Sequence, residues 1–410
     1  MDKFKVKEIC TEIVRKINEE HVKPFKGMKN PLFLIATHNY PGVWLEHVYD
    51  AVFWAQNEPA YLSIAENTIE LFIDNQTREG QYPCYVWDGA IMHIPEQDLI
   101  GYSQIQECVS FGALCLDVYR LSKNKIFLEK CYRSVKNWDA WQRKYRMTLG
   151  TGLVEMFVGY DTGHDNSGRL EGMAYPGLCD KDGKIYNASV LIQDDHVSPI
   201  VAVDMNANFY ATQKALSVMA KELGLQAESE EWEKKAREVK KQLFKICYDE
   251  QDVFFYDVDK KGNIRKYLSS TIFHLFMEKV LDKQEDAELI NKIYTKHIKN
   301  ENEFWTEYPF PSMAVSDPST KDHADRNCWG YFSQALTALR CTRWMDYYGY
   351  EKDFDILCEK FLSAWTKCYD TLKLGQELDP ITGQPSECLE WYSSCMLFYL
   401  FAAKRLRLFE

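Results

Sequence analysis

Amphipathic helical patterns recur along most of the chain, and they constrain its fold more than any other feature. The segment EWEKKAREVKKQLFKICY, residues 231–248, places lysines opposite one apolar face, which is formed by Trp232, Ala236, Val239, Leu243 and Ile246. The segment DILCEKFLSAWTKCYD, residues 355–370, has a similar face, formed by Leu357, Phe361, Ala364, Trp365 and Cys368. Both patterns predict α-helices with one buried side.

Comparable patterns begin near residues 3, 46, 59, 102, 125, 206, 264, 283, 327 and 388. Together with the two segments above they predict about twelve helices. Twelve helices suggest six hairpins, which in a radial arrangement make an all-α (α/α)6 toroid, with loops at one end of the inner ring converging on a pocket. The pattern alone leaves an α-solenoid or a helix bundle open, although no repeat period of 34 or 40 residues is visible.

The helical segments follow one another without a Gly/Ser-rich or Pro-rich linker, so residues 1–410 are expected to form a single domain. The longest interruption, residues 147–200, is expected to be an active-site loop insertion, because a long loop rich in Gly, Tyr and apolar residues is seldom disordered. Short β-hairpins are predicted at DKDGK (180–184) and at DKKGN (259–263). The latter faintly resembles a calcium loop, but Lys261 replaces an oxygen ligand, so a plain turn is favoured.

Composition and charge limit the partners. The net charge of -12 argues against nucleic acid and anionic membranes, which attract basic surfaces. The chain contains 11 Trp, 25 Tyr and 22 Phe, a supply of rings that suits a pocket for a neutral sugar as well as a core.

No secretory signal or membrane span is visible in the sequence. The 13 cysteines contain no CxxC pair, which favours buried thiols in a reducing cytoplasm over disulfides or zinc. We therefore expect a cytoplasmic protein without a metal or cofactor. The oligomeric state is left open.

The stretch VGYDTGHDNSGRL, residues 158–170, carries two aspartates, a histidine and an arginine without helical or strand periodicity. Its core GHDNSGR resembles the Gly-x-Asp-Asn-Ser-x-Arg signature of the α-toroidal glycoside hydrolases, the group that includes processing α-glucosidase I, trehalases and mannosylglycerate hydrolases. Five further blocks resemble that family in the same order. They are VDMNANFYATQKALSVMAKELG (203–224), CYDEQDVFFYDVD (247–259), YPFPSMAVSDP (308–318), NCWGYFSQALTALRCTRWMDYYGY (327–350) and ELDPITGQPSECLEWYSS (377–394).

The resemblance implies hydrolysis of an α-glycosidic bond with inversion, using one carboxylic acid and one carboxylate. The acid protonates the leaving oxygen while the carboxylate activates a water on the opposite face of the sugar. By its place in the motif Asp165 is the general-acid candidate, and it would need a raised pKa. The alternative is that Asp165 only shapes the turn, the role we give Asn166 and Ser167. Asp161 is the reserve acid.

Glu377 is the general-base candidate, because it resembles the glutamate that precedes the family's Asp-Pro-x-Thr-Gly. The DPITG segment (379–383) is itself a predicted turn, which can hold Glu377 on a rigid support. Glu387 and Glu390 are reserve bases beside the same segment.

Sugar recognition is expected from aromatic and hydrogen-bonding groups near these carboxyls. Tyr49 and Asp50 occupy the Trp-Asp positions of the family's N-terminal helix start. An alternative register from Tyr40 and Trp44 would place Glu46 and His47 there instead. Gln104, in a block that resembles a glutamine-bearing helix, is another candidate. The remaining substrate-binding candidates are Asp161, His164, Arg169, Trp305, Trp329 and Trp391.

Three positions depart from the family pattern. Tyr49 and His164 stand where tryptophan is usual, and Gly168 where proline is usual, so the acid loop has lost an aromatic wall and some stiffness. The chain also lacks room for the extra sandwich domain of larger relatives. We expect a small soluble α-glucoside or α-mannoside as the substrate: glucosyl or mannosyl glycerate, a disaccharide such as trehalose, or an oligosaccharide end.

Two other classes of function stay open. A sugar 2-epimerase also uses an α-toroid but needs paired histidines on inner helices. The histidines His47, His93, His196, His274 and His323 show no such helical pairing. A non-catalytic carbohydrate-binding protein would bind sugar without turnover.

Overall fold

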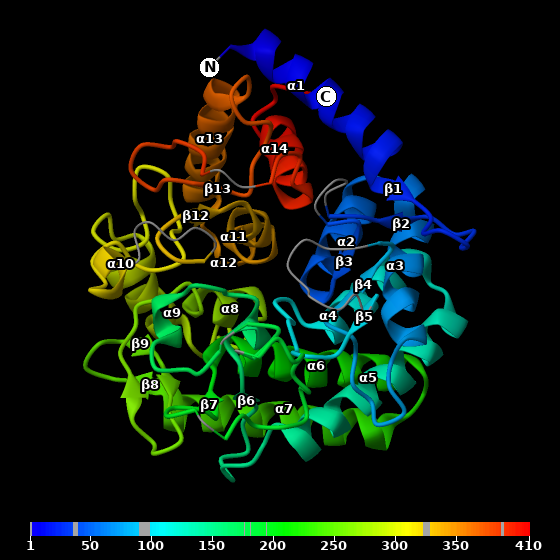
Figure 1. The fold of residues 1–410 in the computed structure, drawn as a ribbon, viewed down its shortest axis with the longest axis vertical. Helices are drawn as coiled ribbons and strands as arrows, with labels where there is room; N and C mark the ends of the chain where they lie inside the picture. Colours follow the sequence, from blue (N-terminus) through cyan, green and yellow to red (C-terminus); the bar gives the residue numbers. More distant parts are fainter. Residues whose placement is uncertain are drawn as a thin grey trace.

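The computed structural model describes residues 2–35, 40–89, 99–175, 177–180, 182–193, 195–322, 329–386 and 389–410. Six helices form an inner set: α2 (Val48–Asn57), α4 (Phe111–Ser122), α6 (Val203–Glu222), α8 (Ile272–Met277), α11 (Ala335–Arg340) and α14 (Ser393–Arg405). Contacts join α2 to α4, α4 to α6, α6 to α8, α11 to α14 and α14 back to α2. This succession runs around a ring in Figure 1.

Outer helices cover this ring. They are α3 (Leu62–Asp74), α5 (Lys125–Tyr145), α7 (Gln226–Cys247), α9 (Ala287–Ile293) with the following turn Tyr294–Ile298, α13 (Glu351–Cys368) and α1 (Lys3–Lys16). Helices α3, α5 and α7 each pack on the inner helix that precedes them, whereas α1 and α13 pack on α14. Two short helices, α10 (Ser319–Asp322) and α12 (Met345–Tyr348), lie between larger elements. The all-α toroid expected from the helical pattern is confirmed.

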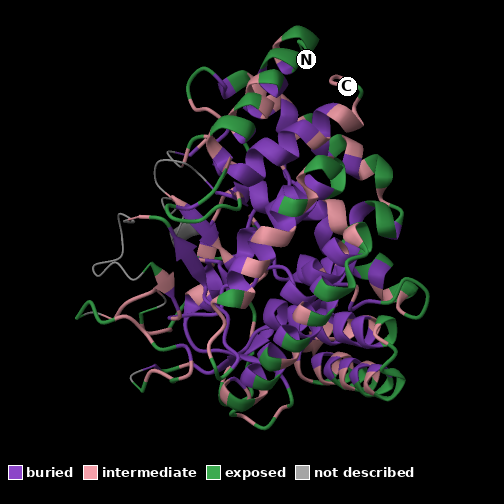
Figure 2. Cartoon of the chain, turned by 90° about the vertical axis from the view of Figure 1, so that its right-hand side faces the viewer, coloured by how far each residue is buried: buried purple, intermediate pink, exposed green. Residues whose placement is uncertain are grey.

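The burial of each helix follows its sequence pattern. In α7 the buried residues include Trp232, Ala236, Val239 and Leu243 as expected, but Cys247 completes the face and Ile246 is only half-buried. The α13 face is buried at all five expected positions. The inner helices α6 and α14 are buried on most sides. α14 is largely apolar, whereas the buried residues of α6 also include the polar side chains Asp204, Asn206 and Gln213. Figure 2 shows the same contrast between a buried interior and exposed outer surfaces.

Several inner helices begin later than the sequence pattern predicts. The helix expected from residue 102 begins at Phe111, and those expected from 264, 327 and 388 begin at Ile272, Ala335 and Ser393. Before α4, the Glu107 side chain accepts a hydrogen bond from Phe111 N at 2.7 Å, and the Ser110 side chain caps the helix through Ala113 N. Such bonds satisfy the first backbone donors of a helix and fix where it begins. Gln104 consequently lies in a loop and not on a helix.

Short antiparallel strands line the loops that lead into the inner helices. One sheet has the order β3 (Gly42–Trp44), β4 (Tyr85–Trp87), β5 (Ile100–Gly101), and another has β11 (Ile264–Arg265), β10 (Asp257–Val258), β7 (Ile200–Val201), β6 (Glu155–Met156). Three pairs complete the set: β12 (Ser333–Gln334) with β13 (Glu377–Leu378), β1 (Val22–Lys23) with β2 (Leu32–Phe33), and β8 (Tyr248–Asp249) with β9 (Phe254–Phe255). Strands β7 and β12 end directly before α6 and α11, so they fix the start of these helices.

Both predicted hairpin turns are present. Gly183 and Gly262 adopt positive φ angles of 78° and 83°, the conformation for which glycine was expected. At the second turn Asp259 accepts hydrogen bonds from the backbone nitrogens of Lys261 and Asn263 at 2.8 and 2.9 Å. Its carboxylate therefore serves the turn itself, as the plain-turn interpretation predicted.

The described cysteines are free thiols, ten of them buried and Cys179 half-buried. The described helices include none with a length and hydropathy suited to crossing a lipid bilayer.

Candidate active site

The acid candidate Asp165 lies in the loop between two short 3-10 turns, Gly159–Thr162 and Gly168–Leu170. Its side chain is half-buried, and its Oδ1 atom is enclosed without a hydrogen-bond partner among the residues that the structure describes. Burial, reinforced by the negative charge of Glu46, raises the pKa of Asp165 well above its usual range. A carboxyl in this state can hold a proton near neutral pH and donate it.

The residues after Asp165 shape the turn. Asn166 has a φ of 51°, a conformation that asparagine tolerates better than most residues. Ser167 donates its backbone N–H to the His164 carbonyl at 3.3 Å. This geometry agrees with the turn role expected for Asn166 and Ser167.

Asp161, four residues earlier, has a different environment. Arg146 donates to both of its oxygens at 2.6 and 3.1 Å, and the backbone nitrogens of Ile105, Phe157 and Val158 donate at 2.8 to 3.0 Å. Both side chains of the ion pair are fully buried. Asp161 thus ties the acid loop to the body of the protein, and its carboxylate is occupied by internal donors.

Arg169 lies behind the same loop. Its guanidinium donates to Asp204 at 2.7 Å and to Asp257 at 3.0 Å, so it links the loop to the start of α6 and to β10. The side chain is 1% exposed. This position suits anchoring of the loop better than direct contact with a sugar.

Glu46 is the carboxylate that faces the acid loop. It is buried just before α2 and accepts hydrogen bonds from Gln106 Nε2 at 3.1 Å and Arg340 at 3.3 Å. A Cβ on Gly163 would lie 3.0 Å from its Oε2, so the loop approaches Glu46 at a position that only glycine fits. Of the two registers considered for this segment, the one with Glu46 and His47 is the one that meets Asp165.

The residues of the other register, Tyr49 and Asp50, make their contacts elsewhere in the protein. Asp50 accepts from the Ser393 hydroxyl at 2.5 Å and from the Ser394 hydroxyl at 2.9 Å, which fastens α2 to α14. The Tyr49 hydroxyl shares a hydrogen bond of 2.6 Å with Thr342 and lines a cavity at the opposite end of the inner ring. His47, which precedes both residues in the chain, has its Nε2 atom 2.6 Å from the Tyr392 hydroxyl.

The base candidate Glu377 lies on β13 and is fully buried. Strand pairing places it opposite Gln334, whose Nε2 donates to Glu377 Oε2 at 2.7 Å. The DPITG turn that follows is closed by Asp379, whose carboxylate accepts from the nitrogens of Ile381 and Thr382 at 2.9 and 2.7 Å. The expected rigid support for Glu377 is therefore present.

The reserve bases are placed differently. Glu390 is exposed on the surface beside Lys373, whose backbone nitrogen lies 3.4 Å from its Oε1. Glu387 lies outside the described residues.

His164 and Trp329 form the aromatic wall nearest the acid. Their rings stack with centroids 4.4 Å apart at 28°, and the Arg340 guanidinium lies 5.6 Å from the Trp329 ring. His274 of α8 meets His164 edge to face at 5.5 Å. The tryptophan expected at position 164 in this family is thus replaced by a histidine backed by Trp329.

His164, Asp204 and His274 bring three atoms of metal-ligand type within 4.8 Å of one another. Asp204 Oδ2 already accepts from Arg169, and this fixed positive charge opposes a second cation at the same oxygen. Burial and Arg169 lower the pKa of His164 well below its usual range, so the ring is neutral at pH 7. We assign the trio to packing and orientation of the acid loop, and the expectation of a metal-free site stays a prediction.

Gln104 joins the site through its neighbour. Its Nε2 donates to Gln106 Oε1, and Gln106 in turn donates to Glu46. The Gln104 Oε1 atom is buried without a partner. The helix expected around it is absent, yet the side chain still faces the carboxylates.

The remaining aromatic candidates divide into two groups. Tyr40 and Trp44 pack around Trp87, at ring distances of 5.7 and 5.2 Å, in the strands that lead to Glu46. Trp305 instead packs on Phe310 with Lys299 over its ring, and Trp391 packs against Tyr369 and Lys16 of α1. These last two tryptophans stabilise the outer packing and are not brought to the carboxyls by the contacts described.

Several residues of the site were not among the sequence-based candidates. They include Gln106, Gln334, Arg340 and Tyr392, and also Arg146, Asp204 and Asp257, which anchor the acid loop. Arg340 had a visible signal, since it and Arg343 are the two cations in the otherwise uncharged run QALTALRCTRW. Gln334 had none, because only the β12–β13 pairing places it beside Glu377.

Comparison with known proteins agrees with this geometry. The structure superposes on a mannosylglycerate hydrolase of glycoside hydrolase family 63 from Thermus thermophilus with a TM-score of 0.72 and 17% identity, over 97% of this chain and 99% of that one. Neutral trehalase from Saccharomyces cerevisiae gives 0.68 and 14%, over 97% and 80%. No curated protein sequence matches the chain significantly.

The family model described as the mannosylglycerate hydrolase MGH1-like glycoside hydrolase domain matches residues 48–386, which include Asp165, Glu377 and all inner helices except α14. The chain therefore belongs to the family of MGH1-like glycoside hydrolase domains.

Proposed function

We propose that the protein hydrolyses an α-glucosidic or α-mannosidic bond of a small soluble sugar with inversion of the anomeric centre. The observation that carries this proposal is the state of Asp165: a half-buried carboxyl with a raised pKa and an oxygen to which none of the described residues donates a hydrogen bond. These are the properties of a general acid, which has to be protonated before it meets the glycosidic oxygen.

Glu377 acts as the base in this mechanism. Its burial and the hydrogen bond from Gln334 keep the carboxylate in one orientation, which suits removal of a proton from a positioned water. Glu46, held by Gln106 and Arg340, would accept hydrogen bonds from sugar hydroxyls while its charge keeps Asp165 protonated. Three carboxyls thus have three separate roles, each set by its surroundings.

The structural neighbours suggest which substrates to test first. One of them is a mannosylglycerate hydrolase and another is a trehalase, so the substrates of both belong in a first panel. The panel should contain mannosylglycerate, glucosylglycerate, trehalose and short α-glucans and α-mannans. Proton NMR during the first minutes distinguishes the released anomers. Release of the cleaved residue as the β-anomer supports inversion, with trehalose giving equal amounts of α- and β-glucose, and release of α-sugar alone contradicts it.

Two variants assign the roles. Asp165→Asn and Glu377→Gln should each abolish most turnover, whereas Glu390→Gln, a matched change at the exposed glutamate, should leave it unaltered. Sugar binding without turnover in the unmodified protein would instead indicate a non-catalytic binding protein.

A sugar 2-epimerase is the rival that one observation favours, because His164 and His274 lie side by side. Burial and the nearby cations Arg340 and Arg169 lower the pKa of His274, as they do for His164, so neither ring supplies a proton near neutral pH. Appearance of a 2-epimer without hydrolysis in the same NMR experiment would favour this rival.

A further inference from the structure

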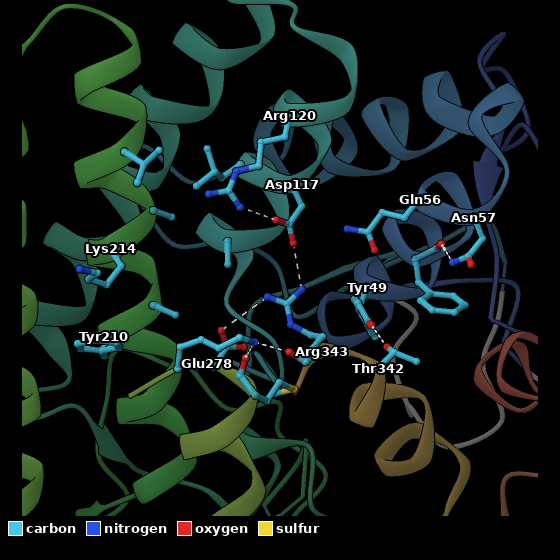
Figure 3. A pocket seen from close by; sticks show the side chains of 18 of the residues that line it. Tyr49, Gln56, Asn57, Asp117, Arg120, Tyr210, Lys214, Glu278, Thr342 and Arg343 are labelled. Atoms are coloured by element: carbon cyan, nitrogen blue, oxygen red, sulfur yellow. Dashed lines mark hydrogen bonds and ion pairs between the residues drawn. The ribbon is translucent and has the colours of Figure 1, made fainter. Parts of the chain in front are cut away.

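A cavity of about 600 Å³ opens at the end of the inner ring opposite to Asp165 and Glu377. The candidate site is built from residues that precede the inner helices, such as Glu46 before α2 and Gln334 before α11. The cavity lining runs along α2, α4 and α6 and includes residues at or beyond the other ends of the inner helices, namely Asn57 of α2, Lys279 after α8 and Arg343 after α11. Figure 3 shows this second cavity, which the proposed hydrolysis does not use.

Arg343 extends into this cavity with hydrogen-bond donors to spare. It donates to Asp117 at 3.1 Å and forms a longer ion pair of 3.9 Å with Glu278, and Figure 3 shows it between these two carboxylates. Its Nε atom is enclosed without a partner in the described part of the chain. Glu278 compensates the charge of Arg343 only weakly, because its other oxygen accepts a hydrogen bond from Ser110 N and burial raises its pKa.

Lys279 also has a hydrogen-bond donor that no acceptor among the described residues uses. Its Nζ donates to the carbonyls of Met277, at 2.8 Å, and Arg343, which leaves the third proton of an ammonium without an acceptor among the described residues. Within that part of the chain no carboxylate lies within 4.0 Å of Nζ. Burial and the positive charge of Arg343 lower the pKa of Lys279 to about 7.

The rim adds further positive charge to a chain whose net charge is -12. Arg120 shares the single carboxylate of Asp117 with Arg343, at 3.2 Å, and Lys214 pairs with Glu233 at 2.6 Å. The cavity lining therefore holds four basic side chains against two acidic ones. Phe53 and Phe401 contribute apolar wall beside the amide of Gln56.

We propose that this cavity binds a small organic anion through the unused donors of Arg343 and Lys279. The guanidinium and ammonium would share the oxygens of a phosphate or carboxylate group, the arrangement in which charge-assisted hydrogen bonds are strongest. The volume lies within the range of small-molecule sites, and the mixed walls suit a carbon skeleton of about the size of one sugar. The site is separate from the proposed hydrolysis and does not depend on it.

Protection of Lys279 from acylation tests the proposal on the unmodified protein. Acetic anhydride at pH 7, where part of the Lys279 amine is still protonated, labels accessible amines, and peptide mass spectrometry gives the rate at each lysine. Inorganic phosphate and malonate, at ionic strength matched with sodium chloride, should each slow labelling of Lys279 at least about tenfold at saturation, while Lys130 on the outer helix α5 should be unaffected. Protection by only one of the two supports the site and selects its ligand class. No protection by either, or equal protection by glucose, would overturn the proposal.

Variants provide a second measurement by calorimetric titration with phosphate. Arg343→Gln and Lys279→Met should each weaken binding about tenfold or more, and the exposed Arg133→Gln should leave it unchanged. Lys279→Met keeps the Arg343–Asp117 pair, so it remains informative if Arg343→Gln does not fold. Unchanged affinity in a folded Lys279→Met would contradict the proposed role of the amine.

Discussion

The two ends of the inner ring differ in the charge of the side chains that gather there. At the end where the helices begin, carboxyls gather: Asp50 and Asp204 lie in first helical turns, and Glu46, Asp165 and Glu377 lie just outside. At the end where they stop, Lys279 donates to the last carbonyl of α8, that of Met277, and Arg343 lies just beyond α11. The positive N-terminal ends of helices stabilise carboxylates, and the negative C-terminal ends stabilise cations.

The two ends of the same six inner helices favour side chains of opposite charge, so one ring of helices can form two different sites. Burial then acts oppositely on the two charged groups, because it disfavours the ionised form of each. The pKa of Asp165 is raised, which keeps a proton on an acid, and the pKa of Lys279 is lowered to about 7, which removes one from a base.

The largest effect is expected from Asp165→Asn. Loss of a general acid typically costs about 10²–10⁴-fold in turnover, and kcat for the best substrate of the panel should fall by this amount. In the unmodified enzyme kcat should fall as pH rises through the pKa of Asp165, a limb that lies well above pH 4 because that pKa is raised. A falling limb that survives in Asp165→Asn would assign the acid elsewhere.

The same variant should become more stable than the parent as pH rises. A folded carboxyl with a raised pKa stays protonated while the unfolded one ionises, so the parent loses stability from about pH 4 up to the folded pKa. Melting curves across pH 4–8 measure this difference. Equal melting temperatures throughout would mean that Asp165 is not held in a costly environment.

Asp161→Asn, the matched change in the same loop, should act on stability instead. It leaves the buried Arg146 without its carboxylate, a loss that costs about 3–5 kcal/mol when one partner of a buried pair is removed. Urea unfolding measures the free energy directly. A fully stable Asp161→Asn protein would show that the backbone donors, and not Arg146, hold the loop.

A smaller effect is expected from Gln334→Met, which removes the hydrogen bond to Glu377 with little change in volume. A hydrogen bond to a charged group contributes about 1.5–3 kcal/mol, so kcat should fall roughly 10- to 100-fold with little change in KM. A change in KM alone would indicate sugar binding and not positioning of the base.

The smallest effect is expected at the opposite end. In Lys279→Met the melting temperature should exceed that of the parent by about 1–2 °C at pH 6, the size that roughly 1 kcal/mol produces in a large domain. The difference should shrink between pH 7 and 10, because the parent gains stability there while its folded amine is neutral and its unfolded amine still charged. A melting-temperature difference that does not change with pH would show that Lys279 is not the group that titrates in this range.

The sequence by itself determined the helical toroid and the two main carboxyl candidates. Apolar spacing along α7 and α13 reports burial directly, because a helix turns by a constant angle per residue. The blocks around Asp165 and Glu377 carried the resemblance, and the turns after both residues are local structures that a few neighbouring side chains close.

Only the tertiary structure decided which polar groups meet. Glu46 and not Asp50 faces Asp165, and Asp161 is paired with Arg146, because these choices depend on contacts between segments far apart in the chain. Gln334 reaches Glu377 through strand pairing across 43 residues. Trp305, Trp329 and Trp391 all lie in or beside the blocks that carry the family resemblance. Of the three, only Trp329 packs on the acid loop. A side chain's type and spacing set its local conformation, but its partner is set by packing that no local pattern records.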